Sequence, residues 1–120
     1  MILGLGTDII EISRIKKALE NPKFITRIYT HEEVQLIEKK GNKWASYAGR
    51  FAAKEAVSKA LGSGIRDFNF NDIEILSDPL GKPYVIFKNN LKNKFSKQRV
   101  ELSISHCKEY AMATAIIMEE

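Results

Sequence analysis

Cysteine, histidine and long apolar runs are scarce in this sequence, which contains one cysteine and two histidines. Because Cys107 is alone, it cannot form an intramolecular disulfide, and the composition fits the reducing cytosol. One cysteine and two distant histidines also cannot build a zinc site, so oxygen ligands for Mg²⁺ remain the option for a metal. No apolar stretch approaches the ~20 residues of a membrane span, and the N-terminus lacks the basic segment of a signal peptide. We therefore expect a cytoplasmic protein that does not cross a membrane.

Runs of like charge and low-complexity segments are also absent, which argues against a disordered basic arm. The chain of 120 residues nevertheless carries a net charge of +4. Such a charge favours an anionic partner, which can be a nucleic acid, a phosphorylated ligand or an acidic protein, although it can also serve solubility alone. The length corresponds to one domain, residues 1–120, which is large enough for a hydrophobic core.

Hydrophobic periodicity and turn residues predict an α+β fold. The expected strands are 2–10, 73–76, 84–87, 100–105 and 110–118, and the expected helices are 13–20, 30–40, 43–61 and 89–97. Pro22 limits the first helix, and a capping box formed by Thr30 and Glu33 marks the start of the second. The long helix 43–61 carries a stripe of small residues that favours close approach to a sheet. We therefore expect this helix to pack on a small, mainly antiparallel sheet, whose later strands form a meander.

Carboxylates, cations and a glycine-rich turn occur together in a way that suits a metal-bound polyphosphate. Asp8 lies near the end of the first strand. Glu55 and Lys59 share one face of the long helix, which Gly62-Ser63-Gly64 follows. Each feature also has an ordinary structural interpretation. Asp8 can be a turn residue, and the glycines can simply end the helix. Glu55 and Lys59 can form a helical salt bridge worth ~0.3–0.5 kcal/mol.

The joint arrangement of these motifs resembles the holo-acyl-carrier-protein synthases, the short bacterial branch of the 4′-phosphopantetheinyl transferases. The matching segments, in chain order, are Gly4-Leu5-Gly6-Thr7-Asp8-Ile9, Arg50 to Ala56 with Lys59, Gly62-Ser63-Gly64-Ile65, Gly81-Lys82-Pro83 and Leu102-Ser103-Ile104-Ser105-His106. The resemblance covers essentially the whole chain. It departs at Cys107, where a small hydroxyl residue is common.

The resemblance implies transfer of the 4′-phosphopantetheine arm of coenzyme A to a serine of the acyl carrier protein, in fatty acid biosynthesis. It implies that Asp8 and Glu55 hold Mg²⁺ and that Lys59 completes the catalytic set. The residues expected to contact coenzyme A are Arg50, Phe51, Lys54, Lys59, Gly62, Ser63, Gly64, Pro83, Ser105 and His106. The general base stays open between Asp8, Glu55 and a water held by a carboxylate, which we favour, with His106 as the second choice.

Two partners follow from the same resemblance. Carrier proteins are acidic beside their modified serine, so we expect Arg14 and Lys17 of the first helix to bind them, with Lys23 and Arg27 extending the patch. The longer branch of the family joins two such modules in one chain. A chain with one module is therefore expected to form a homotrimer with its sites at subunit interfaces.

Two rival functions remain at this point. A basic domain that binds RNA or DNA would carry aromatic residues interleaved with Lys or Arg on a strand face, whereas these strands carry Ser, Glu and Ile. We therefore expect no nucleic-acid partner. An inactive homologue that binds coenzyme A without transfer is disfavoured only because both candidate carboxylates are present.

Overall fold

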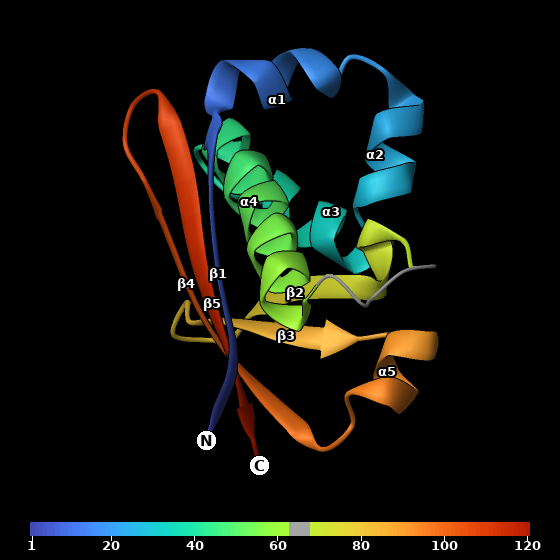
Figure 1. The fold of residues 1–120 in the computed structure, drawn as a ribbon. Coiled ribbons are helices and arrows are strands. Elements are labelled where there is room, and N and C mark those ends of the chain that lie inside the picture. Colours follow the sequence, from blue (N-terminus) through green and yellow to red (C-terminus); the bar gives the residue numbers. More distant parts are fainter. Residues whose placement is uncertain (63–67) are drawn as a thin grey trace.

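The helix α4 (Lys43–Leu61) lies across one face of a three-stranded antiparallel sheet in the computed structural model of the chain, which describes residues 1–62 and 68–120 (Figure 1). The sheet contains β1 (Ile2–Glu11), β4 (Gln98–His106) and β5 (Tyr110–Glu119). Their order is β1-β5-β4, so the last strand of the chain is the central one. The first strand therefore pairs with the last, which places Asp8 opposite Ala113.

A second sheet is formed by the hairpin of β2 (Ile73–Ser77) and β3 (Pro83–Phe87). The remaining elements are the helices α1 (Ile12–Ala18), α2 (Pro22–Ile28), α3 (His31–Glu38) and α5 (Asn90–Lys94) and the 3₁₀ turn η1 (Phe70–Asp72). The α+β fold class is as predicted. The single meander is wrong, because the later strands divide between two sheets.

The sequence reasoning missed helix α2. Pro22 was interpreted only as a limit to the preceding helix, but it lies in the first turn of a new one. Proline is tolerated there because the first N–H groups of a helix have no intrahelical acceptor. The side chain of Asn21 caps this helix by accepting a hydrogen bond from the N–H of Lys23 at 3.0 Å. The predicted helix 89–97 is also too long, since α5 covers only Asn90–Lys94.

Two glycines allow α4 to lie directly on β1. A Cβ atom at Gly4 would lie 1.9 Å from the carbonyl oxygen of Ala60, and one at Gly6 would lie 2.0 Å from that of Ala56. No side chain fits at either position without moving the helix. Since alternate residues of a strand share a face, the next residue on this helix-facing side of β1 is Asp8.

No described helix covers the opposite face of the three-stranded sheet (Figure 1). Apolar side chains are exposed there on two adjacent strands. Leu5 and Ile9 of β1 are 66% and 63% exposed, and Tyr110 and Met112 of β5 are 42% and 41% exposed. We call these residues, together with Leu3, the outer face. Of the described helices, none combines the length and apolarity needed to cross a membrane.

Candidate functional site

Asp8 and Lys59 meet where α4 crosses β1. The ammonium of Lys59 lies 3.2 Å from Oδ1 of Asp8 and donates a hydrogen bond to the carbonyl oxygen of Thr7 at 3.0 Å. Glu55, one turn earlier on α4, is close enough for its electrostatics to be affected by both residues. Burial raises the pKa of Glu55, the charge of Asp8 raises it further, and Lys59 opposes the shift. The structure thus brings together the three residues that the sequence predicted as catalytic.

The ordinary helical salt bridge between Glu55 and Lys59 is not formed. Lys59 pairs with Asp8 instead, and among the described residues Glu55 has no hydrogen-bond or ion-pair partner. A half-buried carboxylate beside a second carboxylate is left without a full counter-charge. This arrangement attracts a cation.

The carboxylate pair fits Mg²⁺ but does not form a complete cage. Within residues 1–62 and 68–120, no group of three or more His, Cys, Asp or Glu side chains could hold a metal ion. Mg²⁺ commonly takes one or two carboxylates and fills its remaining positions with water and substrate phosphates. Asp8 and Glu55 are donors of the right kind and number for that mode.

Arg50 forms a second polar cluster, at a cavity of about 350 Å³. Its side chain is only 6% exposed. The guanidinium donates to the hydroxyls of Ser46 and Ser77, each at 2.9 Å, and its Nε is buried without a partner. Burial lowers the pKa of Arg50. A buried cation that meets only neutral hydroxyls and keeps a free donor is well suited to an anionic ligand.

Pro83 and His106, both predicted to contact coenzyme A, line this cavity with Arg50. Lys40 lines it too and adds a further cation, which the sequence reasoning did not select. Ser46 was also missed, although its position four residues before Arg50 on one helix is a usable signal. No sequence signal could have identified Ser77, because it comes from β2, far along the chain.

The two clusters lie on opposite sides of α4. At 3.6 residues per turn, the five residues from Arg50 to Glu55 correspond to a rotation of about 140° around the helix axis. Asp8 belongs to the edge strand β1 and His106 to the other edge strand, β4, with β5 between them. A single chain therefore presents the carboxylates and the anion cavity in different directions.

Other predicted ligand residues lie apart from both clusters. Phe51 packs between Phe24 and Phe70, with ring centroids at 6.1 and 6.0 Å. Ser105 is exposed and pairs with Met112 of the outer face. Gly62 ends α4 with a φ of +94°, a conformation that favours glycine. Ser63 and Gly64 lie outside the described residues.

Lys54 requires a correction. Its side chain is 0% exposed, and its ammonium lies 2.8 Å from Oε1 of Glu33. It also donates to the carbonyl oxygens of Phe70 and Ile73 at 3.1 and 2.7 Å. Burial lowers the pKa of Lys54, and Glu33 opposes that shift. All three N–H groups are therefore engaged inside the protein, so direct contact with coenzyme A is wrong for this residue.

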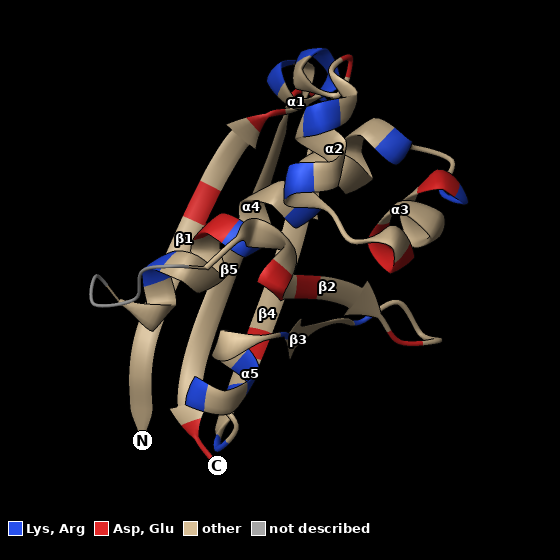
Figure 2. Ribbon diagram, turned by 90° about the vertical axis from the view of Figure 1, so that its right-hand side faces the viewer, with Lys and Arg blue, Asp and Glu red and all other residues tan. Residues whose placement is uncertain are grey.

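The basic residues expected to meet a carrier protein are exposed on two helices. Lys and Arg positions gather on α1 and α2, whereas Asp and Glu gather on α3 (Figure 2). The exposed members are Arg14, Lys16, Lys17, Lys23 and Arg27, and Lys16 was not among those expected. Within α1, Ile15 is buried, so the helix has an inner apolar side and an outer basic side. This surface suits an acidic protein.

Comparisons with known proteins agree over the full length of the chain. A family profile described as the 4′-phosphopantetheinyl transferase superfamily matches residues 4–115. A holo-(acyl-carrier-protein) synthase of Fusobacterium nucleatum is 51% identical, with 98% of this chain and 100% of that protein covered. The crystal structure of a holo-(acyl-carrier-protein) synthase from Bacillus anthracis, in complex with CoA (3′,5′-ADP), is 43% identical with a TM-score of 0.84, covering 100% and 99% of the two chains. The corresponding structure from Neisseria meningitidis is 36% identical with a TM-score of 0.89, covering 99% and 100%.

Proposed function

The chain belongs to the 4′-phosphopantetheinyl transferase superfamily, and from that membership we propose that it transfers the 4′-phosphopantetheine group of coenzyme A to a serine of an apo-acyl carrier protein. The reaction would release adenosine 3′,5′-bisphosphate and serve fatty acid biosynthesis in the cytoplasm. One observation carries the proposal: Asp8, Lys59 and Glu55 converge where α4 crosses β1. This is the charge distribution that transfer of a phosphoryl group requires.

The reaction balances as a substitution at phosphorus. A bond forms between the serine Oγ and the β-phosphorus, and the bond to the leaving phosphate oxygen of the bisphosphate breaks. Asp8 and Glu55 would hold Mg²⁺, which when bound supplies positive charge to the diphosphate. Lys59 donates N–H groups to a phosphate oxygen as a mobile point charge, since its side chain is 55% exposed.

The proton of the serine hydroxyl needs an acceptor. Burial and the charge of Asp8 raise the pKa of Glu55 when no metal is present, but bound Mg²⁺ would oppose that shift, so the carboxylate itself is a poor acceptor. A water molecule that Glu55 orients can accept the proton instead, which is the acceptor favoured from sequence. His106 is a weaker choice in the same subunit, because it lines the cavity on the other side of α4.

The phosphate groups of coenzyme A are anions of the kind that the cavity beside Arg50 can bind. The buried guanidinium, with its unpartnered Nε, can bind a phosphate group of the nucleotide end. His106 and Lys40 line the same cavity and can add donors. We assign Arg50, Pro83 and His106 to the nucleotide and Lys59 to the phosphates near the reacting atom.

A homotrimer would unite the two clusters. The carboxylates of one subunit and the Arg50 cavity of its neighbour can face one ligand, although each chain directs them apart. The outer face supplies an apolar surface for such contacts, since Leu5 and Ile9 are mostly exposed. The exposed basic residues of α1, Arg14 and Lys17, then remain available for the acidic carrier protein.

Mass spectrometry of one reaction tests the proposal. Purified protein, coenzyme A and Mg²⁺ are incubated with an apo-acyl carrier protein. We expect the carrier to gain the mass of one 4′-phosphopantetheine group, and a carrier whose acceptor serine is replaced by alanine to gain none. Binding of coenzyme A without any mass gain would favour the inactive homologue and overturn the proposed transfer.

A further inference from the structure

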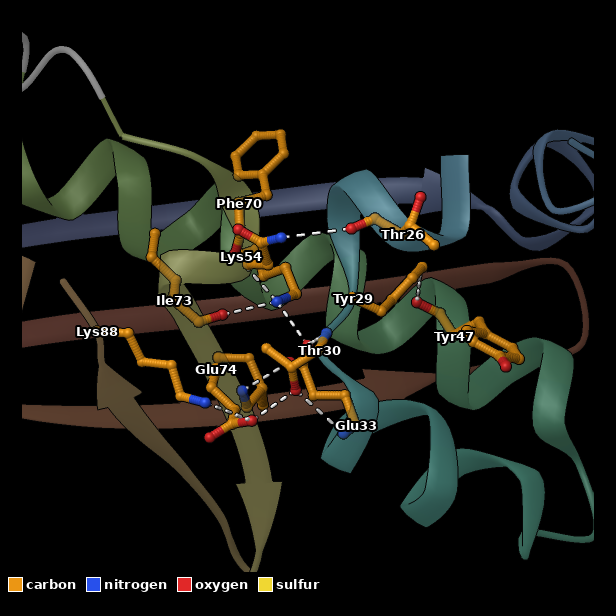
Figure 3. A network of polar contacts seen from close by, with 12 residues as sticks. Thr26, Tyr29, Thr30, Glu33, Tyr47, Lys54, Phe70, Ile73, Glu74 and Lys88 are labelled. Carbon is orange, nitrogen blue, oxygen red and sulfur yellow. Dashed lines mark hydrogen bonds and ion pairs between the residues drawn. The ribbon is translucent and has the colours of Figure 1, made fainter. Parts of the chain in front are cut away.

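The interior of the protein contains a charged network that connects α4 with α3 and β2 (Figure 3). At its centre, the ammonium of Lys54 binds Glu33 of α3, the carbonyl of Phe70 in η1 and the carbonyl of Ile73 in β2. One side chain of α4 therefore fixes the helix to three other elements. The residue next to it in the chain is Glu55.

The carboxylate of Glu33 is equally enclosed, at 0% exposure. Its Oε1 accepts from the backbone N–H of Thr30 at 2.8 Å as well as from Lys54, and its Oε2 accepts from the N–H of Ile75 at 2.7 Å. The hydroxyl of Thr30 continues the network by donating a hydrogen bond to Glu74. The ammonium of Lys88, directly after β3, lies 3.4 Å from the same carboxylate. The capping box of α3 therefore belongs to the same network of hydrogen bonds and ion pairs.

Against β1, α4 packs through small residues, with Gly4 against Ala60 and Gly6 against Ala56. The directional contacts of α4 with β1 come from Lys59, which binds Asp8 and the carbonyl oxygen of Thr7. Small residues permit close approach but offer few interlocking side chains. Removing a charged pair from water is costly, so a buried pair is weak evidence for added stability. Its directional bonds can instead select one arrangement of the helix.

We propose that Glu33 and Lys54 are a positioning pair, which sets the rotation of α4 that directs Glu55 toward Asp8. The inference rests on the proposed function and adds residues to it that touch neither substrate nor metal. Lys54 and Glu55 are consecutive, so any roll of α4 that separates Lys54 from Glu33 also displaces the carboxylate of Glu55. A misplacement of about 1 Å at a reacting group can cost ~100-fold in rate.

The test uses a double variant that removes both charges of the buried pair, Glu33→Gln with Lys54→Met. The amide oxygen of the introduced side chain can still accept from one of the two backbone N–H groups, that of Thr30 or that of Ile75, and the other loses its acceptor. We expect the variant to fold, to bind Mn²⁺ in the presence of 3′,5′-ADP about 10- to 100-fold more weakly than the wild type, and to lose a similar factor in kcat rather than in KM for the carrier. Mn²⁺ binding is read by electron paramagnetic resonance, independently of turnover.

The matched control is the exposed ion pair between the same two parts of the chain, Lys43 and Glu38, which lie 3.4 Å apart. Glu38→Gln with Lys43→Met changes the same residue types, and we expect Mn²⁺ affinity within about twofold of the wild type. If the buried double variant does not fold, the Mn²⁺ affinity of the single variant Glu33→Gln is measured instead, and it tests the positioning role in the same way. Unchanged Mn²⁺ affinity in a folded variant would overturn the positioning role.

The outcomes separate this inference from the proposed function. A wild type that binds Mn²⁺ but transfers nothing would overturn the transfer reaction, and the comparison of Mn²⁺ affinities would still decide the role of the pair. A wild type that binds no Mn²⁺ with 3′,5′-ADP would overturn both, because Asp8 and Glu55 would then not be a metal site.

Discussion

Lys59 of α4 pairs with Asp8 of β1 across 3.2 Å and leaves Glu55, one turn earlier on its own helix, without a partner among the described residues. The choice of the distant carboxylate has a geometric cause, since Gly6 lets the helix lie directly on the strand beside Asp8. Lys59 therefore neutralises the charge of Asp8 by direct pairing, whereas it only partly opposes the raised pKa of Glu55. In the candidate site, the fold therefore holds two carboxylates close together with one direct ammonium partner, which is electrostatically unfavourable.

Replacing Glu55 should change stability and activity in opposite directions. Burial and the charge of Asp8 raise the pKa of Glu55, so the ionised carboxylate is less stable in the folded state than in the unfolded chain. We expect Glu55→Gln to raise the melting temperature of the metal-free protein at neutral pH while it lowers transfer by orders of magnitude. Calorimetry and carrier mass spectrometry measure the two effects. A variant that is less stable and fully active would contradict the assignment.

Replacing Arg50 should weaken nucleotide binding without harming the fold. The guanidinium is buried beside neutral hydroxyls, so Arg50→Met removes a cation that has no carboxylate partner within the described residues. A hydrogen bond to a charged group contributes about 1.5–3 kcal/mol, which corresponds to roughly 10- to 150-fold in the Kd of 3′,5′-ADP by calorimetric titration. The exposed Lys92→Met on α5 is the control, with an unchanged Kd expected. Equal affinities in Arg50→Met and wild type would remove Arg50 from the nucleotide site.

Local patterns predicted most of the helices and strands, and the residues near the α4–β1 crossing. Periodicity identified α4 and β1, and the capping box at Thr30 is confirmed by both of its hydrogen bonds. Pro22 was misread because proline both ends and begins helices, and only the capping contact of Asn21 distinguishes the two cases.

Long-range packing accounts for what the sequence could not provide. The resemblance implied that Lys54 contacts coenzyme A, whereas Glu33 and two carbonyl oxygens enclose its ammonium group. Its partner Glu33 was recognised only as part of a helix cap, although its carboxylate also accepts hydrogen bonds from Lys54 of α4 and from the N–H of Ile75 in β2. Likewise, Ser77 reaches Arg50 from 27 positions away in the sequence, and no local rule connects them.

The contact between Gly6 and α4 should be intolerant of a methyl group. A Cβ at Gly6 would lie 2.0 Å from the carbonyl oxygen of Ala56, and backbone cannot yield as a side chain does. We expect Gly6→Ala to lower the free energy of unfolding by about 1–3 kcal/mol or more. Gly41→Ala is the stability control, because a Cβ there meets nothing within 4 Å, and its effect should stay within about 0.5 kcal/mol. Equal stabilities in denaturant titrations would show that α4 does not rest on β1.

Alkaline pH should unfold the protein partly through Tyr29. Burial raises the pKa of Tyr29 above its ordinary value of 10.0, with the charge of Glu33 as the next cause. The folded state therefore retains this proton at pH values where the unfolded chain loses it. Stability from this group is complete below pH 10 and falls as the pH rises above it. Tyr29→Phe should flatten the decline of the unfolding free energy above pH 10, at the cost of about 1 kcal/mol for the lost hydrogen bond to the carbonyl of Tyr47. An unchanged slope would contradict this origin.

The outer face should control assembly and, through it, activity. Leu5 is 66% exposed on that face, so Leu5→Glu adds a charge to the surface proposed for subunit contact while the fold of one chain is left intact. We expect sedimentation equilibrium to give a trimer for the wild type and a monomer for the variant. Transfer should fall with the trimer, because the Arg50 cavity and the carboxylates face different sides of α4 and, in the proposed assembly, meet only between two chains. Leu80→Glu makes the same change at a residue that is 96% exposed in the turn between β2 and β3, and it should remain trimeric. A wild type that is monomeric at the concentration of a productive assay would show that one chain suffices, and the nucleotide would then have to reach both clusters around α4.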